Sequence, residues 1–231
     1  MLLLALDTAT PAMTAALHDG SRVLAGQTVV SSRRHGELLA AMIEQVLAEG
    51  GVTRNDLEAI GVGTGPGPYT GLRAGLVTAR VLSSALGIPA VGVCTLDVIA
   101  REAAAAAAGR EFIVAADARR KELYWARYAP AGRRIGEPMV GSPAEVALAA
   151  AAPGTAPPGL GPAPWPVAGE GPALYPELGA CPIPPRYPDA ARLAEIAAQR
   201  LAEGGPPGPP EPLYLRHPDA RVPGQPKRVT P

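Results

Sequence analysis

This chain has few cysteines, few histidines and no net charge. Its 231 residues include two cysteines and three histidines, and 21 Lys+Arg balance 21 Asp+Glu. Cys94 and Cys181 stand far apart without CxxC spacing, which argues against a zinc site or a disulfide framework, so we expect two buried thiols in a reducing compartment. Without surplus positive charge to neutralise phosphates, any contact of this chain alone with a nucleic acid should be weak.

Common catalytic signatures are missing as well. No HxxxH or HExxH pair occurs among His18, His35 and His217, and there is no Gly-x-Ser-x-Gly elbow, so neither a catalytic metal set nor a serine nucleophile is offered. The opening apolar run 2–6 has no basic residues before it and is too short for a signal peptide core or a membrane span. We expect it to be a buried strand in a cytoplasmic protein without membrane contact.

A weak internal repeat is the most informative pattern that is present. Leu3–Asp7 overlays Ile113–Asp117 at an offset of 110 residues, and both runs are apolar and end in aspartate. A short polar segment after each copy leads into a second apolar strand, over 13–17 and 123–128. Self-similarity over half the chain predicts a duplicated fold, since solenoid repeats span roughly 20–50 residues. Two unrelated hairpins remain the alternative.

Strands and helices alternate after each copy of the repeat. We predict helices over 35–49, 70–86 and 95–108, the last capped by Thr95, with strands over 57–62 and 90–93 between them. After the second copy we predict a short helix from Ser142 or Pro143, a strand from 166 and a helix over 190–203 capped by Asp189. This alternation predicts an α/β fold with a mostly parallel sheet covered by helices.

Proline is concentrated in the last third. Of 28 prolines, 21 lie between Pro153 and Pro231, where regular structure must thin out because proline lacks a backbone donor. We expect a surface loop over 152–166, a stiff linker over 204–212 and an apolar segment over 213–215 that folds back. The chain then divides into an N-terminal lobe over 1–109, a C-terminal lobe over 110–216 and a disordered tail over 217–231.

A glycine-rich loop over 63–75 joins a strand to a helix. Backbone N–H groups at a helix N-terminus attract anions, yet the loop lacks the Lys-Ser/Thr end of a P-loop, and Pro66 and Pro68 each remove a donor. The competing interpretation is structural, because glycine permits positive φ and close helix packing. The motif alone favours the structural interpretation.

Two aspartates and two helices also admit two interpretations. Asp7 and Asp117 could face each other across a cleft and hold a metal or position a nucleotide, or each could cap its own turn. A vestigial nucleotide cleft would comprise Asp7, Thr8, Gly65, Gly67 and Asp117.

The helix over 70–86 carries a ridge of small residues that lets another helix approach closely, and the helix over 35–49 has an apolar stripe. The two helices could bury each other within one chain or present a patch to a second chain, and the pattern alone favours the first.

Five sequence motifs along this chain resemble those of the TsaB (YeaZ) family and stand in the order that the family has. Together they cover nearly the whole chain. The Gly-Pro-Gly…Thr-Gly-Leu-Arg segment and the Asp-Ala-Arg after the second strand are the most specific. Pro68-Tyr69 departs from the Ser-Phe of many members, which argues further against phosphate binding. The motifs are Leu4–Thr10, Arg33–Leu39, Gly65–Arg73, Ala116–Arg119 and Pro212–Arg216.

The resemblance implies the duplicated actin-like (ASKHA, ribonuclease-H-like) fold, with two lobes that each hold a mixed sheet flanked by helices. It implies a non-catalytic subunit that pairs with the transferase TsaD, recruits the ATPase TsaE and reaches tRNA only through that complex. The complex makes threonylcarbamoyl-adenosine next to the anticodon in tRNAs reading codons that begin with A. The histidine pair of TsaD is absent, since Leu39 stands four residues after His35, so ATP and metal are expected in the partners and no cofactor in this chain alone.

The resemblance also favours an interface role over a core role for residues of the two helices over 35–49 and 70–86. Members of the family pair through the first two helices of the N-terminal lobe, as homodimers or with TsaD. The residues expected at that interface are Leu38, Leu39, Met42, Leu72, Arg73, Leu76 and Arg80.

Two rival functions remain. An independent actin-like kinase would bind ATP with Asp7, Asp117 and the Gly65 loop. A peptidase, a label sometimes attached to these families, would need a nucleophile or a catalytic metal, for which the sequence offers no candidate.

Overall fold

Two five-stranded sheets follow one plan in the computed structural model, which describes residues 1–31, 35–150, 164–204 and 208–216. The strand order is β3-β2-β1-β4-β5 in the first sheet and β8-β7-β6-β9-β10 in the second. In both sheets, neighbours among the first three strands of this order are antiparallel. The last two strands run parallel to the central strand, which is β1 in the first sheet and β6 in the second. The strands are β1 (Leu3–Asp7), β2 (Ala12–His18), β3 (Val23–Val30), β4 (Ala59–Gly63), β5 (Ala90–Val93), β6 (Phe112–Asp117), β7 (Leu123–Tyr128), β8 (Arg134–Gly141), β9 (Pro166–Ala168) and β10 (Cys181–Pro182).

The helices also repeat, because in each half of the chain a helix follows the third, the fourth and the fifth strand. They are α1 (His35–Glu49), α2 (Tyr69–Leu86), α3 (Thr95–Ala106), α4 (Pro143–Ala150), α5 (Gly171–Leu174) and α6 (Ala190–Ala202), with short 3₁₀ turns η1 (Arg54–Asp56) and η2 (Pro176–Leu178). The repeat at 110 residues therefore places β1 and β6 at the centres of equivalent sheets, and the duplicated actin-like fold is confirmed.

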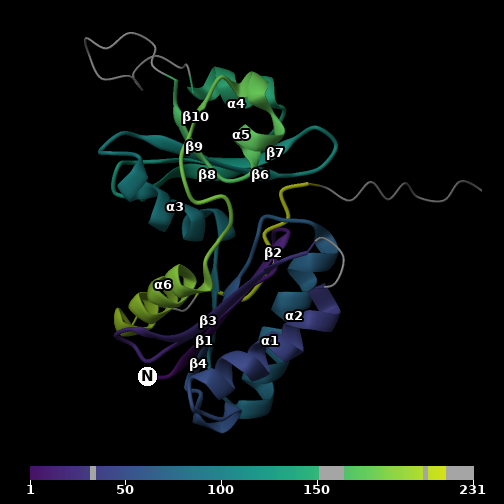
Figure 1. The fold of residues 1–231 in the computed structure, drawn as a ribbon, viewed down its shortest axis with the longest axis vertical. Helices are drawn as coiled ribbons and strands as arrows, with labels where there is room; N and C mark the ends of the chain where they lie inside the picture. Colours follow the sequence, from purple (N-terminus) through teal and green to yellow (C-terminus); the bar gives the residue numbers. More distant parts are fainter. Residues whose placement is uncertain (32–34, 151–163, 205–207, 217–231) are drawn as a thin grey trace, which may run out of the picture.

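Two helices cross between the lobes. α3 follows the first sheet in sequence but packs on β6, β7 and β9, whereas α6 follows the second sheet and packs on β1, β2 and β4. α3 and α6 also contact each other between the two sheets, while α1 and α2 cover the outer face of the first sheet (Figure 1). Each lobe is therefore completed by a helix from the other half of the chain.

The central strands are buried on both faces. Leu4 and Leu6 of β1 pack into the cluster under α1 and α2, while Leu3 and Ala5 pack against α6. Side chains alternate between the faces of a strand, so a strand covered by helices on both faces reads as a continuous apolar run. This is why β1 and β6 were the most recognisable elements in the sequence.

The third strand of each sheet was missed. β3 lies at the sheet edge and alternates exposed with partly buried residues, and β8 contains Gly136, Glu137 and Pro138, which are poor strand formers. The expected cap of α3 was also wrong: the N-cap is Cys94, and Thr95 is the first helical residue. Asp189 does cap α6, because its Oδ1 accepts a hydrogen bond from the Ala191 N–H.

The cysteines differ in exposure. Burial raises the pKa of the Cys94 thiol to about 12, but Cys181 is exposed, which corrects the expectation of two buried thiols. Neither is in a disulfide. Within the described part of the chain, no helix is both long and apolar enough to cross a bilayer.

The chain folds back after α6, as the apolar segment 213–215 predicted. We call residues 208–216 the C-terminal strap. The Gly92 N–H donates to the Gly208 carbonyl oxygen at 2.7 Å, and the Leu213 N–H donates to that of Thr64 at 2.8 Å. The tail predicted over 217–231, most of the loop over 152–166 and part of the linker over 204–212 lie outside the described residues.

Candidate functional site

The glycine-rich loop is closed by contacts within the chain. The Gly65 N–H donates to Thr95 Oγ1 at 3.1 Å, and the Gly65 carbonyl oxygen accepts from the Thr95 N–H at 2.8 Å. A Cβ added at Gly67 would collide with the carbonyl oxygen of Ala9, and one at Gly63 would collide with the Asp7 carboxylate. Close backbone approach therefore accounts for these two glycines without a ligand.

Asp7 is fully buried beside this loop. Its Oδ1 accepts a hydrogen bond from the Ala9 N–H at 2.7 Å, and its Oδ2 accepts one from the Thr95 hydroxyl at 2.8 Å. Burial disfavours the charged form more than these two bonds favour it, so the pKa of Asp7 rises from 3.8 to about 6. The carboxylate therefore joins β1 to the start of α3.

Asp7→Asn should change the pH dependence of stability. Because the pKa of Asp7 is raised on folding, the folded chain binds more protons than the unfolded chain between pH 4 and pH 6, and wild type loses stability as pH rises through that window. Relative to Asp7→Asn the loss should be at most about 1.4 kcal/mol per pH unit. Urea unfolding of both proteins at pH 4, 5, 6 and 7 measures it, and a constant difference would contradict the assignment.

The other cleft candidates have partners of their own. Thr8 Oγ1 donates to the Gly71 carbonyl oxygen at 2.6 Å and accepts from the Gly75 N–H at 3.0 Å, which fastens α2 to β1. Asp117 Oδ1 accepts from the Arg119 N–H at 2.8 Å, and its Oδ2 forms an ion pair with the Arg119 guanidinium at 3.0 Å. No group of three or more His, Cys, Asp or Glu that could hold a metal occurs among the described residues. The nucleotide cleft stays a prediction.

A buried glutamate beside Asp117 was missed by sequence reasoning. Glu170 follows β9 and is 5% exposed. Burial, together with the nearby Asp117 carboxylate, raises its pKa. It stands between Gly169 and Gly171, and a single glutamate between glycines carries no signal of burial.

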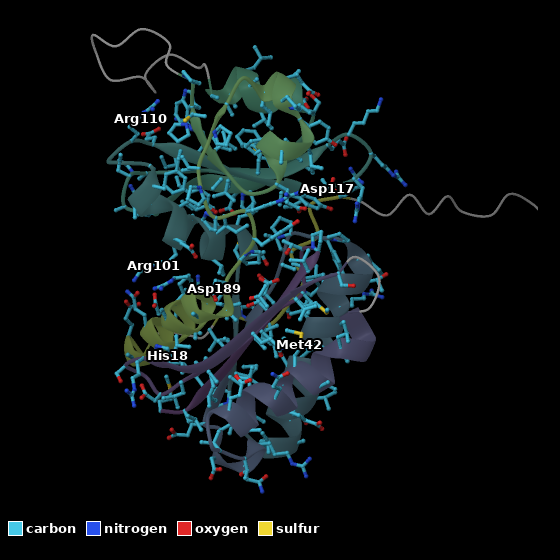
Figure 2. All side chains as sticks on the ribbon, in the orientation of Figure 1. His18, Met42, Arg101, Arg110, Asp117 and Asp189 are labelled. Atoms are coloured by element: carbon cyan, nitrogen blue, oxygen red, sulfur yellow. The ribbon has the colours of Figure 1, made fainter. Side chains whose placement is uncertain are left out.

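An open cleft lies where three separate segments meet. It measures about 470 Å³ and is lined by the loop 67–69, the β6–β7 turn at 118–120, Tyr124 and the strap residues 213–216. In Figure 2 Asp117 stands at the side of the second sheet that faces the strap and the first lobe. The motif Pro212–Arg216 therefore contributes residues 213–216 to one wall of this cleft.

Three side chains clasp the strap to the first turn of α2. The rings of Tyr69 and Tyr214 stack with their centroids 5.4 Å apart. The Arg73 guanidinium lies 3.6 Å from the centre of the Tyr69 ring, and its Nε donates to the Tyr214 hydroxyl at 3.0 Å. Arg73, expected at an interface, therefore already has two partners within the chain.

Most of the expected interface residues lie in the core. The exposed fractions of Leu39, Met42, Leu72 and Leu76 are 1–3%, and all four belong to the cluster between α1, α2 and the first sheet. Met42 lies on the inner side of α1 (Figure 2). The interface role expected for these four is corrected, because their side chains have no surface to offer a partner. Leu38 is half-buried against the same cluster.

The outward face of α2 is apolar at two other positions. Val77 and Val81 are 57% and 60% exposed, and they lie one and two turns after Arg73 on the same side of the helix. Arg80 is exposed beside them. Valines four residues apart, opposite the stripe of Leu72 and Leu76, were the signal for this face in the sequence.

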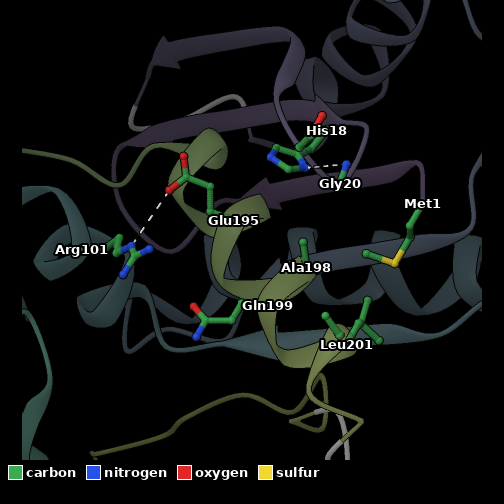
Figure 3. Close-up of a pocket in the computed structure, with 10 residues that line it drawn as sticks. Met1, His18, Gly20, Arg101, Glu195, Ala198, Gln199 and Leu201 are labelled. Carbon is green, nitrogen blue, oxygen red and sulfur yellow. Dashed lines mark hydrogen bonds and ion pairs between the residues drawn. The ribbon is translucent and has the colours of Figure 1, made fainter.

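A second cavity, of about 600 Å³, lies on the α6 side of the first sheet. His18 Nδ1 accepts a hydrogen bond from the Gly20 N–H at 2.9 Å, and Arg101 Nε lies 4.0 Å from Glu195 Oε2, both of which line the cavity (Figure 3). None of the residues singled out as site candidates in the sequence lines it. The motifs therefore converge on the cleft beside the strap rather than here.

Known proteins that are similar to this chain in sequence or structure include members of two related families, TsaD and TsaB (YeaZ). A family model of TsaD, tRNA N6-adenosine threonylcarbamoyltransferase, matches residues 28–178. The uncharacterized protein Rv3421c of Mycobacterium tuberculosis is 42% identical over 94% of this chain and 93% of its own length. The tRNA threonylcarbamoyladenosine biosynthesis protein TsaB of Escherichia coli is 35% identical over 55% of each chain. The solved structure of YeaZ from Pseudomonas aeruginosa superimposes with a TM-score of 0.72 at 31% identity, covering 93% of this chain and 99% of that one.

Proposed function

Since this chain belongs to the TsaB (YeaZ) family, we propose that it is the non-catalytic partner of a TsaD-type transferase in tRNA threonylcarbamoyladenosine biosynthesis. The observation that carries the proposal is the likeness to YeaZ over almost the whole of both chains at 31% identity. The TsaB name of the Escherichia coli relative supplies the pathway. A match to the TsaD family model supports pairing of two related folds.

The proposal assigns the chemistry to the other subunits. The complex would form threonylcarbamoyl-adenosine next to the anticodon in tRNAs reading codons that begin with A, in the cytoplasm, with a TsaE-type ATPase as third component. ATP and metal would be bound by the partners, and this chain alone would be a homodimer.

Contact with the partner would use the outward face of α2. Val77 and Val81 provide exposed apolar surface, and Arg73 and Arg80 flank it. Interfaces combine an apolar centre with aromatic and arginine side chains more than ordinary surface does. Tyr69, 54% exposed at the start of the same helix, extends this face.

The kinase and peptidase alternatives have less support. A kinase site would need Asp7, Thr8 and Gly65 free for a nucleotide, and each is hydrogen-bonded within the chain. A peptidase would need a nucleophile motif or a metal set, and the sequence offers no candidate for either.

Reconstitution tests the proposal. The purified chain, a TsaD-type subunit and a TsaE-type ATPase from one organism are combined with unmodified tRNA, ATP and threonylcarbamoyl-adenylate, and modified nucleoside is measured by mass spectrometry. We expect modification only when this chain is present, and a heterodimer mass for the chain mixed with the TsaD-type subunit. Equal modification without this chain would remove the proposal.

A further inference from the structure

Four exposed side chains follow one another at intervals of four residues on the outward side of α2. They are Tyr69, Arg73, Val77 and Val81, and residues four apart lie on the same side of a helix. The stripe is apolar at its C-terminal end, whereas a tyrosine and an arginine form its N-terminal end. These two residue types are enriched among the residues that dominate binding energy at protein interfaces. We therefore expect the N-terminal end of the stripe to contribute most to binding.

Arg73 is already held in place in the free chain. Its guanidinium lies 3.6 Å from the centre of the Tyr69 ring, and its Nε donates a hydrogen bond to the Tyr214 hydroxyl at 3.0 Å. An exposed arginine without such contacts samples many rotamers, and ordering it in an interface opposes association. Because Tyr69 and Tyr214 order this side chain beforehand, a partner that binds through it has less entropy to overcome.

The strap holds Tyr214 by contacts on both sides of that residue. Before it, the Leu213 N–H donates to the Thr64 carbonyl oxygen at 2.8 Å, and after it, Arg216 forms an ion pair with Glu122 of the second lobe. None of these anchors lies on α2. The place of Tyr214 is therefore set independently of the arginine that it holds.

The contacts of Arg73 lie at the surface rather than in the core. Tyr69 and Tyr214 are 54% and 46% exposed, and Arg73 is exposed as well. Water competes for the hydroxyl and the guanidinium at such a place, so their hydrogen bond contributes little to the free energy of unfolding. Its larger effect is to restrict the rotamers of Arg73, and that restriction matters when another molecule binds there.

We propose that Tyr214 is a positioning residue for the partner surface of α2, because it holds Arg73 and Tyr69 in the geometry in which they meet the TsaD-type subunit. The inference rests on the proposed function, which places the partner on this face of the helix. Arg73 and Tyr214 are 141 positions apart in the sequence. The proposal therefore gives the motifs Gly65–Arg73 and Pro212–Arg216 one shared task.

A double-mutant cycle on the affinity for a TsaD-type subunit of the same organism tests the proposal. Surface plasmon resonance measures the Kd of wild type, Tyr214→Phe, Arg73→Ala and the double variant. Tyr214→Phe keeps a ring that can stack but removes the hydroxyl, so we expect Kd to rise about three- to tenfold. Arg73→Ala should raise Kd about tenfold or more. In the Arg73→Ala background, Tyr214→Phe should change Kd less than about twofold, because the side chain that it positions is absent.

Tyr187→Phe is the matched control. Tyr187 lies in the segment before α6, and the Arg186 guanidinium is 5.3 Å from the centre of its ring. The exchange therefore removes the hydroxyl of another tyrosine beside an arginine, away from α2, and Kd should stay within twofold of wild type. The Tm of Tyr214→Phe should stay within about 2 °C of wild type, because the lost hydrogen bond is exposed.

The remaining outcomes distinguish the inference from the proposed function. Equal Kd for Tyr214→Phe and wild type overturns the inference alone, and so does an effect of Tyr214→Phe that is the same with and without the Arg73 side chain. A rise in Kd together with a lowered Tm in Tyr214→Phe would indicate a structural role and also overturn it. Failure of wild type to bind the TsaD-type subunit removes the proposed function instead, and the inference falls with it.

Discussion

Val77→Asp is expected to abolish pairing with the TsaD-type subunit while the chain stays folded. Val77 is 57% exposed on α2, so in the free chain an aspartate there remains in water. In the proposed complex the same carboxylate would be buried against an apolar partner surface, which weakens association about 100-fold or more. Size-exclusion chromatography with mass measurement reports pairing, and circular dichroism reports the fold.

Two other aspartate variants serve as references for Val77→Asp. Leu148→Asp, at a 72% exposed position of α4, should leave both pairing and folding unchanged. Leu72→Asp should unfold the chain, because Leu72 is 1% exposed in the core, so loss of pairing in that variant would say nothing about an interface. Normal pairing by Val77→Asp would place the partner surface away from the outward face of α2.

Asp97→Ala is expected to lower the free energy of unfolding by about 3 kcal/mol. Asp97 lies on α3 and accepts three hydrogen bonds from the second lobe, two from Arg134 at 2.9 Å and one from the Tyr128 hydroxyl at 2.9 Å. Tyr128 is fully buried, and the Arg134 side chain is only 27% exposed. Alanine would therefore leave a partly buried guanidinium and a buried hydroxyl without their acceptor.

Urea unfolding measures this loss, and Glu137→Ala is the matched control. Glu137 also approaches Arg134, at 4.0 Å, but its side chain is 88% exposed. A solvent-exposed pair of this kind contributes about 0–1 kcal/mol. Equal destabilisation by the two variants would mean that Asp97 does not join α3 to the second lobe as described.

The central strands and most helices could be predicted because their local signals agree with their environments. β1 and β6 are apolar up to the aspartate that ends each strand, since both faces of each are covered, and Gly87, with a φ of 68°, caps the C-terminal end of α2. Edge strands gave no such signal. β3 mixes exposed valines with Gln27 and Thr28, and its partners are set by the hairpin with β2 rather than by its own pattern.

The candidate site was predicted less well than the fold. Sequence placed Leu39, Met42, Leu72 and Leu76 at an interface because the helices that carry them were expected to pair, but an apolar stripe looks the same whether it faces a sheet or another chain. Val77 and Val81 were overlooked for the same reason. Which side of a helix faces solvent depends on the elements packed against it.

By itself the sequence determined the duplication, the central strands, the helix cap at Asp189 and the family, because each depends on neighbouring residues or on matching motifs. Only the tertiary structure decided that α3 and α6 each pack on the sheet of the other lobe, and that the Asp7 carboxylate accepts a hydrogen bond from Thr95. It also decided that the strap meets the β6–β7 turn across a cleft. The Asp7–Thr95 and Glu122–Arg216 contacts, for example, join residues 88 and 94 positions apart. No local pattern specifies them, since they arise only when the two sheets are packed through their shared helices.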